Sequence, residues 1–303
     1  MTGASHCSGA GPTLRIAIIA NPVSGGGRAF RRLNRLLRAW PHSDWDVELH
    51  TTRCPGHAGA LARELQKQPP DLLAVCGGDG TLSDVASNVP EPSFPVALLP
   101  GGTANVLAHE FDIPLDPVRA MEIALRRTVR RVDLGILEGR DHRRFLLMAG
   151  VGLDAYVVSK IRPGKRKLGI AAYYAATLRA LATYSFPEFR VILPGEVMTA
   201  SSCIIANAAG YGGGLVLTPD ADMSDGMLDL LILQGKPRIS HLRVLSAAWL
   251  GKPRDDSCSR RRIAALRIEG KRGIWIQADG ELTGTLPVDV SLAHAGFPLV
   301  VPG

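Results

Sequence analysis

Leu72-Leu-Ala-Val-Cys-Gly-Gly-Asp-Gly-Thr81 is an apolar run that leads directly into a glycine-rich polar turn. A short apolar run bounded by turn residues predicts a strand that is buried on both faces. The residues after the turn follow a helical pattern through about Asn88. The segment therefore predicts a strand–turn–helix unit, from which parallel sheets with right-handed crossovers are built.

The same unit occurs twice more near the start of the chain. Residues 14–20 lead into Asn21-Pro-Val-Ser-Gly-Gly-Gly27, and residues 96–99 lead into Pro100-Gly-Gly-Thr-Ala-Asn105. In a parallel sheet, ligands bind outside the carboxyl ends of the strands, where all three turns would lie. Glycine lets backbone N–H groups close on an anion, and a helix N-terminus favours negative charge. The three turns therefore predict a site for the phosphates of a nucleotide.

The character of the chain changes at about residue 131. Helical patterns occur near 168–183 and 239–250, but most of this region consists of strand-like runs separated by Gly, Pro and Asp. These runs are 132–138, 145–149, 189–193, 201–208, 227–233, 263–269, 274–278 and 288–293. We predict the α/β class: an N-terminal α/β nucleotide-binding domain with a parallel sheet, then a C-terminal β-rich, sandwich-like domain.

The predicted limits of these parts follow the change in pattern. A Gly/Ser-rich flexible tail covers residues 1–13, the nucleotide-binding domain 14–130, and the β-rich substrate domain 131–290. Residues 291–303 form a last segment that either ends as a tail or returns to the first domain.

The net charge of +7 and the pI of about 9.4 favour anionic partners such as nucleotides, acidic lipid surfaces or nucleic acid. Nucleic acid has little support, because aromatic residues make up only 5% and are not interleaved with basic ones. Five cysteines without a C-x-x-C motif indicate reduced thiols in a cytoplasmic protein. No apolar run reaches the ~18 residues of a spanning helix, and the start does not resemble a signal peptide.

Asp79 is the informative residue of the second turn. The common phosphate fingerprints, G-x-x-x-x-G-K-[ST] and a G-x-G-x-x-G between strand and helix, are absent from the sequence. A carboxylate that faces phosphates repels them unless a cation or a substrate hydroxyl lies between. The alternative is a plain helix N-cap, although a cap does not need the flanking glycines.

The three turns, in this order and spacing, resemble the diacylglycerol kinase catalytic-domain family of lipid kinases, and most of all its soluble bacterial members. Further matches extend the resemblance over nearly the whole chain. They are Lys167-Leu-Gly, Asn207 with the glycine-rich loop 210–214, Pro219 to Asp229, and Asp279-Gly-Glu281. Gly-Gly-Asp-Gly-Thr alone would indicate only the wider superfamily, which includes the sphingosine kinases.

The resemblance implies an ATP-dependent kinase that phosphorylates a lipid hydroxyl, most closely that of a diacylglycerol. The implied ATP contacts are Asn21, Pro22, Val23, Ser24, Gly25, Thr52, Gly78, Asp79, Gly80, Thr81, Leu82, Ser83, Asp84 and Thr103. Asp79 would also take part in catalysis. Glu281 is favoured as the acceptor of the hydroxyl proton, with Asp279 as the alternative, because a carboxylate can take that proton as the hydroxyl attacks.

Two roles for Mg²⁺ are expected. One ion accompanies ATP and offsets charge on the transferring phosphoryl group. The resemblance also implies a structural Mg²⁺ in the second domain, held by the side chain of Asp225 and the carbonyl groups of Asp222 and Met227. The alternative is an ordinary Asp-Gly turn without a metal.

Two positions depart from the family pattern. Val106 stands where many bacterial members have Asp, and Gly26-Gly27 stand where many have Lys or Arg, with Arg28 as a replacement. The substrate could therefore be a sphingoid base, phosphatidylglycerol or another hydroxyl compound. The chain could also be a catalytically impaired nucleotide- or lipid-binding protein.

The lipid would be reached from a membrane surface, by peripheral contact at the inner membrane. Residues 160–167 carry five basic side chains in eight positions, which suits an anionic bilayer. They could instead bind substrate phosphate or form a solvated loop. The sequence leaves the oligomeric state open.

Overall fold

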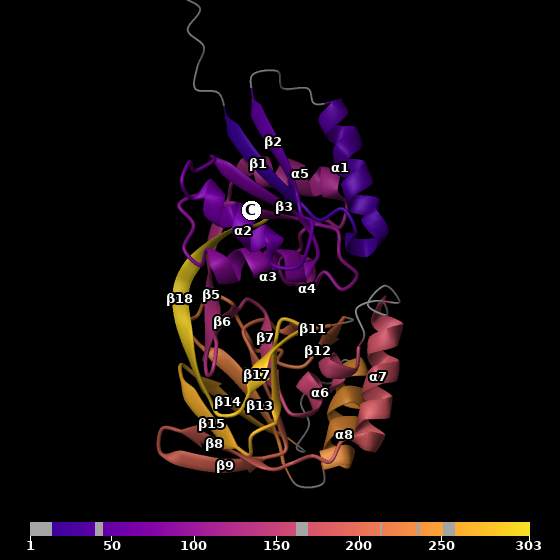
Figure 1. The fold of residues 1–303 in the computed structure, drawn as a ribbon, viewed down its shortest axis with the longest axis vertical. Coiled ribbons are helices and arrows are strands. Elements are labelled where there is room, and N and C mark those ends of the chain that lie inside the picture. Colours follow the sequence, from indigo (N-terminus) through magenta and orange to yellow (C-terminus); the bar gives the residue numbers. More distant parts are fainter. Residues whose placement is uncertain (1–13, 40–44, 162–168, 213, 235–236, 251–257) are drawn as a thin grey trace, which may run out of the picture.

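The computed structural model describes residues 14–39, 45–161, 169–212, 214–234, 237–250 and 258–303. The predicted tail over 1–13 and most of the basic segment 160–167 lie outside these ranges. The structure has two lobes, one above the other in Figure 1, and strands along one edge run from lobe to lobe.

The upper lobe is a parallel sheet with helices on both faces (Figure 1). Its strands are β1 (Arg15–Ala20), β2 (Asp46–Thr51), β3 (Leu72–Gly77) and β4 (Val96–Pro100), in the order β2-β1-β3-β4. On one face lie α1 (Arg28–Arg38), which follows the 3-10 turn η1 (Ser24–Gly27), and α5 (Pro117–Arg126). On the other face lie α2 (His57–Leu65) and α3 (Asp79–Asn88). A short helix, α4 (Val106–Glu110), lies at the lower edge of this lobe (Figure 1).

Two long strands, β5 (Val129–Glu138) and β18 (Val288–Val300), connect the lobes. β18 pairs in parallel with β4 at Leu299 and Val300, and antiparallel with β5 and with β15 (Leu266–Gly270). A continuous sheet therefore runs β2-β1-β3-β4-β18-β15 and on through β8 (Phe189–Leu193) and β9 (Glu196–Ala200). β5 and β6 (His142–Phe145) lie off this path. Because β5 and β18 cross residues 130 and 290, the domain limits at these positions remain an interpretation.

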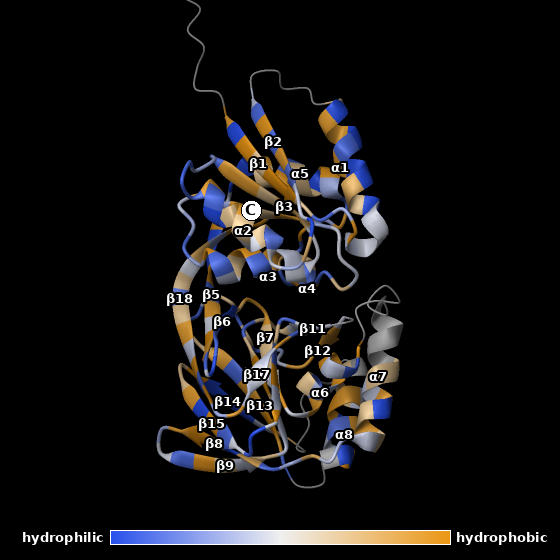
Figure 2. Ribbon diagram, in the orientation of Figure 1, coloured by the Kyte–Doolittle hydropathy of each residue, from blue (hydrophilic) through white to orange (hydrophobic). Residues whose placement is uncertain are grey.

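The lower lobe packs a second, antiparallel sheet against the lower end of the first. Its order is β14-β13-β10-β7-β16-β17, and side chains of both sheets, such as Val151 and Ile268, share one core. Figure 2 shows hydrophobic segments in the strands of both sheets in this lobe. The further strands of the two sheets are β7 (Met148–Val151), β10 (Ser202–Ala206), β13 (Leu228–Leu233), β14 (Cys258–Ile263), β16 (Trp275–Ala278) and β17 (Glu281–Thr285).

The remaining elements lie at one side of the lower lobe (Figure 1). They are the helices α6 (Leu153–Lys160), α7 (Gly169–Thr183) and α8 (Pro237–Trp249) and the small strand pair β11 (Gly210–Tyr211) and β12 (Leu215–Val216). Within the described ranges, no helix is long and apolar enough to cross a membrane.

The predicted fold class is confirmed: the three strand–turn–helix units form a parallel sheet, and a β-rich, sandwich-like region follows. One predicted strand, 145–149, is interrupted, since β6 ends at Phe145 and β7 begins at Met148. The backbone N–H groups of Leu146 and Leu147 donate to the side chain of Asp279 instead of a neighbouring strand.

Several elements were not expected from the sequence, among them α6, β9, β14 and β17. α6 buries most of its residues, including Asp154, so it lacks the apolar stripe that marks a surface helix. β14 is an edge strand that contains three arginines in succession. Apolar and polar residues therefore do not alternate along it, and this alternation is the usual sequence signal of a strand.

Candidate active site

The three glycine turns meet at the carboxyl end of the parallel sheet. The N–H of Gly101 donates to the carbonyl of Gly77 over 2.7 Å. A Cβ atom on Gly102 would lie 2.6 Å from the Cα of Gly78, and one on Gly25 would lie 2.3 Å from the carbonyl oxygen of Gly101. The turns touch backbone to backbone, so only glycine fits at these contacts.

Asn21 holds the first turn against the second. Its backbone N–H donates to the carbonyl of Cys76 over 2.8 Å, and its side chain accepts from the N–H of Val23 over 3.1 Å. The side-chain amide also donates to the hydroxyl of Thr81, on α3, over 3.3 Å. In the third turn, Asn105 has a φ of +47° and accepts from the N–H of Gly102 over 2.8 Å. Both asparagines therefore hold the turns in shape through their side chains.

Asp79 is the first residue of α3, but its carboxylate serves the neighbouring helix. It accepts from the N–H of Val106 over 3.0 Å and from the N–H of Leu107 over 3.1 Å, at the start of α4. Burial raises the pKa of Asp79, and the negative charge of Asp279 raises it further. The side chain thus ties the second turn to the third and lies close to an acidic group of the other lobe.

Asp279 lies on the turn between β16 and β17 and has a φ of +47°. Its carboxylate accepts from the N–H groups of Leu146, Leu147 and Met148 over 2.7, 2.9 and 3.0 Å. It also accepts from the hydroxyl of Ser83, a buried residue of α3. Because these four donors come from both lobes, Asp279 fixes the acidic turn beneath the glycine turns.

Glu281, two residues later, is much less constrained. Its carboxylate pairs with Arg143 over 3.0 Å, and its side chain is 46% exposed. A carboxylate with one charged partner and open access can turn toward a substrate hydroxyl. The two candidate proton acceptors therefore differ in environment, and the difference favours Glu281.

A buried polar network behind the acidic turn was not predicted from the sequence. Gln277 donates to the carboxylate of Asp154 over 2.6 Å and accepts from the N–H of Gly280 over 2.7 Å. Tyr211 donates its hydroxyl to the other oxygen of Asp154. The network holds the backbone between Asp279 and Glu281. A sequence signal for it exists, since Asp154 is the one acidic residue in the otherwise apolar run 145–158.

The remaining predicted nucleotide contacts are distributed around the turns. Thr52 follows β2, and its N–H donates to the carbonyl of Ala20 over 2.9 Å. Gly80 and Thr103 are exposed, and a Cβ on Gly80 would meet no atom within 4 Å. Val23 is 75% exposed, whereas Pro22 and Ser24 are half-buried.

Two of the predicted contacts have side chains that point elsewhere. Leu82 is fully buried in the core of the upper lobe, so only its backbone could face a ligand. The carboxylate of Asp84 accepts from the N–H of Gly59, on α2, over 3.0 Å and from Asn88 over 3.1 Å. The structure brings the turns together around a common surface but leaves these two side chains outside it.

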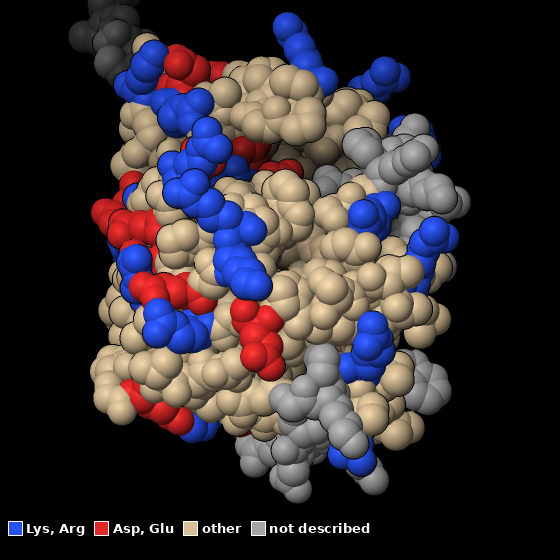
Figure 3. All heavy atoms as spheres, turned by 60° about the horizontal axis from the view of Figure 1, so that its bottom comes forward, with Lys and Arg blue, Asp and Glu red and all other residues tan. Residues whose placement is uncertain are grey.

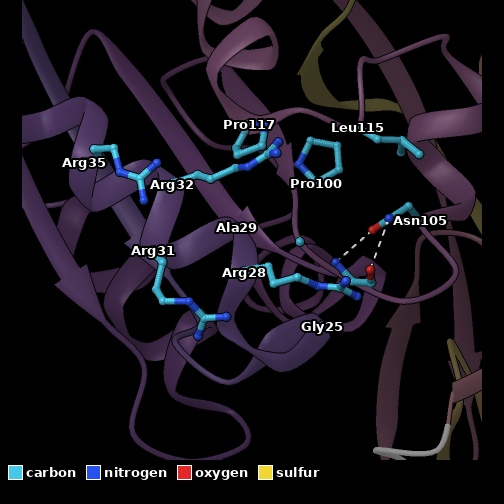
Figure 4. Close-up of a pocket in the computed structure, with 12 residues that line it drawn as sticks. Gly25, Arg28, Ala29, Arg31, Arg32, Arg35, Pro100, Asn105, Leu115 and Pro117 are labelled. Carbon is cyan, nitrogen blue, oxygen red and sulfur yellow. Dashed lines mark hydrogen bonds between the residues drawn. The ribbon is translucent and has the colours of Figure 1, made fainter.

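A cavity of about 470 Å³ adjoins the first and third turns (Figure 4). One side consists of turn residues, and the other consists of arginines on one face of α1. The lining includes Gly25, Gly101, Gly102, Asn105, Arg28, Arg31, Arg32 and Arg35. Arg32 pairs with Asp116 over 2.5 Å, and Arg31 donates to the carbonyl of Gly26 over 3.2 Å. Arg28 lies beside the turns, so the cationic replacement suggested by the sequence is in a suitable place.

In the turn predicted to hold a structural metal, the carboxylates form ion pairs with arginines. One oxygen of Asp225 pairs with Arg262, and the other accepts from the N–H of Met227 over 2.9 Å. The carboxylate of Asp222 pairs with Arg130 over 2.7 Å. In the described part of the chain, no group of three His, Cys, Asp or Glu residues could hold a metal ion. With Arg262 on Asp225, these residues do not fit a bound cation, and the metal at this turn stays an untested prediction.

Val106, the departure from the family pattern, is buried. A Cβ on Gly210 would lie 2.9 Å from its Cγ1 atom, so the valine side chain faces β11 in the lower lobe. On the same helix, Glu110 accepts from the N–H of Gly210 over 3.1 Å. The position therefore contributes an apolar contact between the lobes.

Two family models match the chain, one in its first half and one in its second. Residues 15–137 match the diacylglycerol kinase catalytic domain, and residues 148–302 match the YegS C-terminal NAD kinase beta sandwich-like domain. A diacylglycerol kinase of Mycobacterium tuberculosis (strain CDC 1551 / Oshkosh) is 28% identical, with 95% of each chain covered. The diacylglycerol kinase of Bacillus subtilis (strain 168) is 27% identical, covering 95% of this chain and 96% of its own length.

A relative from Pseudomonas fluorescens, named "Probable lipid kinase YegS-like", is 33% identical and covers 78% of this chain and 79% of its own. Among solved structures, a diacylglycerol kinase from Bacillus anthracis str. Sterne superposes with a TM-score of 0.72 at 21% identity, covering 96% of this chain and 98% of that chain. At this identity, the structural likeness establishes the fold.

Proposed function

The chain belongs to the diacylglycerol kinase-like family of lipid kinases, and we propose that it transfers the γ-phosphoryl group of ATP to the hydroxyl group of a diacylglycerol-like lipid. The observation that carries this proposal is the bond between Ser83 and Asp279. Through it, the acidic turn of the lower lobe lies against the helix that follows the second glycine turn. This bond supports the proposal because it holds the proposed phosphate site and the acidic turn close together.

We propose that the glycine turns hold the phosphates of ATP. The exposed backbone at Gly80 and the start of α3 offer N–H groups and a favourable helix terminus to an anion. Arg28, beside Gly25 and Asn105, adds a positive charge at the rim (Figure 4). Catalysis of phosphoryl transfer depends mostly on positioning and electrostatic stabilisation. The upper lobe would contribute to catalysis through these groups, which would position the phosphates and stabilise their charge.

Glu281 is the proposed proton acceptor, and Asp279 is the proposed positioning residue. The carboxylate of Asp279 already accepts four hydrogen bonds, which leaves little capacity to take a proton from a substrate. Glu281 has one charged partner, Arg143, and an exposed side chain. A lipid hydroxyl that enters the cleft would give its proton to Glu281 as its oxygen attacks the γ-phosphate.

Mg²⁺ bound with ATP suits the second turn. Each oxygen of Asp79 accepts one N–H from α4, and a carboxylate oxygen has a second lone pair that a cation or a bound water can use. The ion would neutralise charge on the phosphates when bound. Asp79 would be a ligand of this ion, and the same carboxylate fixes the start of α4.

The test is a phosphoryl-transfer assay with labelled ATP, with and without Mg²⁺, on diacylglycerol, a sphingoid base, phosphatidylglycerol and NAD. We expect labelled phosphatidic acid from diacylglycerol in the presence of Mg²⁺. Glu281→Gln should lower kcat by about 10²–10⁴-fold, the usual contribution of a general base. The control is Glu138→Gln, an exposed carboxylate at the end of β5, which should retain activity. Label in NAD alone would refute the lipid assignment.

A second assay separates the kinase from a binding protein that has lost catalysis. ATP binding is measured by calorimetry alongside turnover on a total lipid extract with mass detection of the product. Binding without any phosphorylated lipid, and without an effect of Glu281→Gln, would favour the binding protein. A phosphorylated product other than phosphatidic acid would keep the kinase and replace the substrate.

A further inference from the structure

Helices α7 and α8 are in contact at one side of the lower lobe (Figure 1). Arg238, near the start of α8, donates to the carbonyls of Leu181 and Tyr184, at the end of α7, over 3.0 and 3.3 Å. Its guanidinium also lies 5.4 Å from the centre of the Phe186 ring. These contacts join the end of one helix to the beginning of the next, so the two helices present a common outer surface (Figure 1).

The outer surface of this pair carries four exposed large apolar side chains. Leu178 of α7 is 64% exposed, and Ile239, Leu242 and Leu250 of α8 and its last turn are 48%, 51% and 64% exposed. Leu250 continues the helical geometry, because its N–H donates to the carbonyl of Ser246 over 2.9 Å. Residues 239, 242 and 250 share one face of a helix. The opposite face, with Val244 and Ala248, is buried.

The same surface has a uniform positive charge. The sequences of α7 and α8 contain Arg179, Arg238 and Arg243 and no Asp or Glu. Arg179 and Arg243 are exposed and alternate with the apolar residues. In Figure 3, the right-hand side, where Figure 1 shows α7 and α8, has Lys and Arg spheres and no Asp or Glu sphere.

We propose that this outer surface, the α7–α8 face (Leu178, Arg179, Ile239, Leu242, Arg243 and Leu250), binds the surface of an anionic lipid bilayer. Apolar side chains with arginines between them suit the boundary between headgroups and acyl chains, where leucine is buried and arginine meets phosphate. A second copy of the chain is a poor occupant, because two arginine-bearing faces would repel each other.

The location of the α7–α8 face relates it to the candidate active site. α7 packs against α6, and α6 packs against β16 and β17, the strands on either side of the acidic turn. Docking of this face would therefore bring the bilayer to the side of the lobe that supports Glu281. The inference rests on the proposed function, because a kinase with a lipid substrate has to work at a bilayer.

Vesicle flotation tests the proposal without any turnover. Wild-type protein should float with phosphatidylcholine vesicles that contain phosphatidylglycerol and should stay behind with pure phosphatidylcholine vesicles. Arg179→Gln/Arg243→Gln and Leu178→Ser/Leu242→Ser should each lower the bound fraction at least fivefold. The controls are Arg131→Gln/Arg272→Gln and Val197→Ser, at exposed positions on other elements. Equal binding of the variants and wild type would overturn the proposal.

A label placed on the face guards against variants that fail to fold. An environment-sensitive fluorophore on Ser246→Cys, in a background with Cys7→Ser, Cys54→Ser and Cys258→Ser, should shift to shorter wavelength when anionic vesicles are added. The same fluorophore on Cys54, which is exposed on the upper lobe, should not shift when only Cys7 and Cys258 are replaced by serine. A shift at Cys54 and none at 246 would place the contact elsewhere and reject the α7–α8 face.

The two proposals fail in different ways. If the protein binds anionic vesicles through this face but phosphorylates no lipid, the kinase assignment fails and the face stands. If detergent-dispersed diacylglycerol is phosphorylated while the face variants float like wild type, the kinase stands and the face is wrong.

Discussion

The hydroxyl of Ser83, on α3, donates a hydrogen bond to the carboxylate of Asp279, on the turn between β16 and β17. The two residues are 196 positions apart in the chain and belong to different lobes. Since Ser83 is one turn beyond Asp79, this bond sets the distance between the second glycine turn and the acidic turn. It is therefore a direct point at which the geometry of the cleft can be tested.

Ser83→Ala should lower kcat more than it affects binding of ATP. The hydroxyl is used by Asp279, so its removal loosens the acidic turn and should reduce kcat by about tenfold to a hundredfold. The loss of a hydrogen bond to a charged group should reduce the free energy of unfolding by about 1–3 kcal/mol. Steady-state kinetics and urea unfolding measure the two effects.

Ser93→Ala is the control for this substitution, because Ser93 makes its side-chain bond to Gln66 at the surface of the upper lobe. If Ser83→Ala raises the KM for ATP and leaves kcat unchanged, Ser83 does not act by holding Asp279 in place. That result would instead support the direct ATP contact of Ser83 that the family resemblance implies.

Asp79→Asn should change how stability depends on pH. Burial, with the charge of Asp279, raises the pKa of Asp79 above its ordinary value of 3.8. The folded protein thus holds this proton more tightly than the unfolded chain. The resulting stabilisation is fully present below the ordinary pKa and is lost as pH rises through the folded pKa. Asparagine does not titrate, so wild type should lose stability relative to the variant as pH rises across this window.

Asp79→Asn should also lower the free energy of unfolding by an amount that does not depend on pH. An asparagine has a single acceptor oxygen, so one of the N–H groups of Val106 and Leu107 loses its partner, at a cost of about 1–3 kcal/mol. Urea unfolding of both proteins at a series of pH values measures both effects. If wild type instead becomes more stable relative to the variant as pH rises over this range, the folded protein stabilises the charged form of the carboxylate.

The meeting of the three glycine turns could be predicted from the sequence because it follows from a local rule. Each apolar run ends in a turn, and the carboxyl ends of parallel strands lie at one edge. The partners of the acidic side chains follow no such rule. A helix after the third turn could be expected from the sequence, but nothing in the sequence indicates that its first N–H groups, at Val106 and Leu107, bond to Asp79.

The ion pair at the turn predicted to hold a structural metal depends on long-range strand pairing. Arg262 lies in an edge strand with no apolar alternation, and its approach to Asp225 depends on the register of β13 and β14. The family resemblance suggested a metal at Asp225 because it compares residues one by one. It could not take account of an arginine that arrives from 37 positions away.

Because of Arg262, Mg²⁺ should not stabilise the turn at Asp225 that was predicted to hold a metal. Its guanidinium pairs with the carboxylate that the predicted metal would use. The Tm of wild type should therefore be the same in EDTA and in Mg²⁺. In Arg262→Ala, the carboxylate of Asp225 is free of this cation, so Mg²⁺ should raise the Tm of the variant and EDTA should reverse the effect. Differential scanning calorimetry without nucleotide measures this.

Arg261→Ala is the matched control, since Arg261 lies in the same strand and pairs with Glu196 instead. Its Tm should not respond to Mg²⁺. A fall in the Tm of wild type in EDTA would mean that Asp225 binds a divalent ion despite Arg262.

Alanine at two glycines of the turns should separate folding from nucleotide binding. At position 102, the new Cβ would lie 2.6 Å from the Cα of Gly78, and neither backbone can move without opening the turns. Gly102→Ala should therefore lower both the Tm and the affinity for ATP.

At position 80, a Cβ meets no protein atom within 4 Å, and alanine within a helix is favoured over glycine by up to about 1 kcal/mol. Gly80→Ala should thus keep or raise the Tm, while its methyl group occupies space next to the proposed phosphates and weakens ATP binding measured by calorimetry. If Gly80→Ala binds ATP as tightly as wild type, the phosphates do not lie against this part of the second turn.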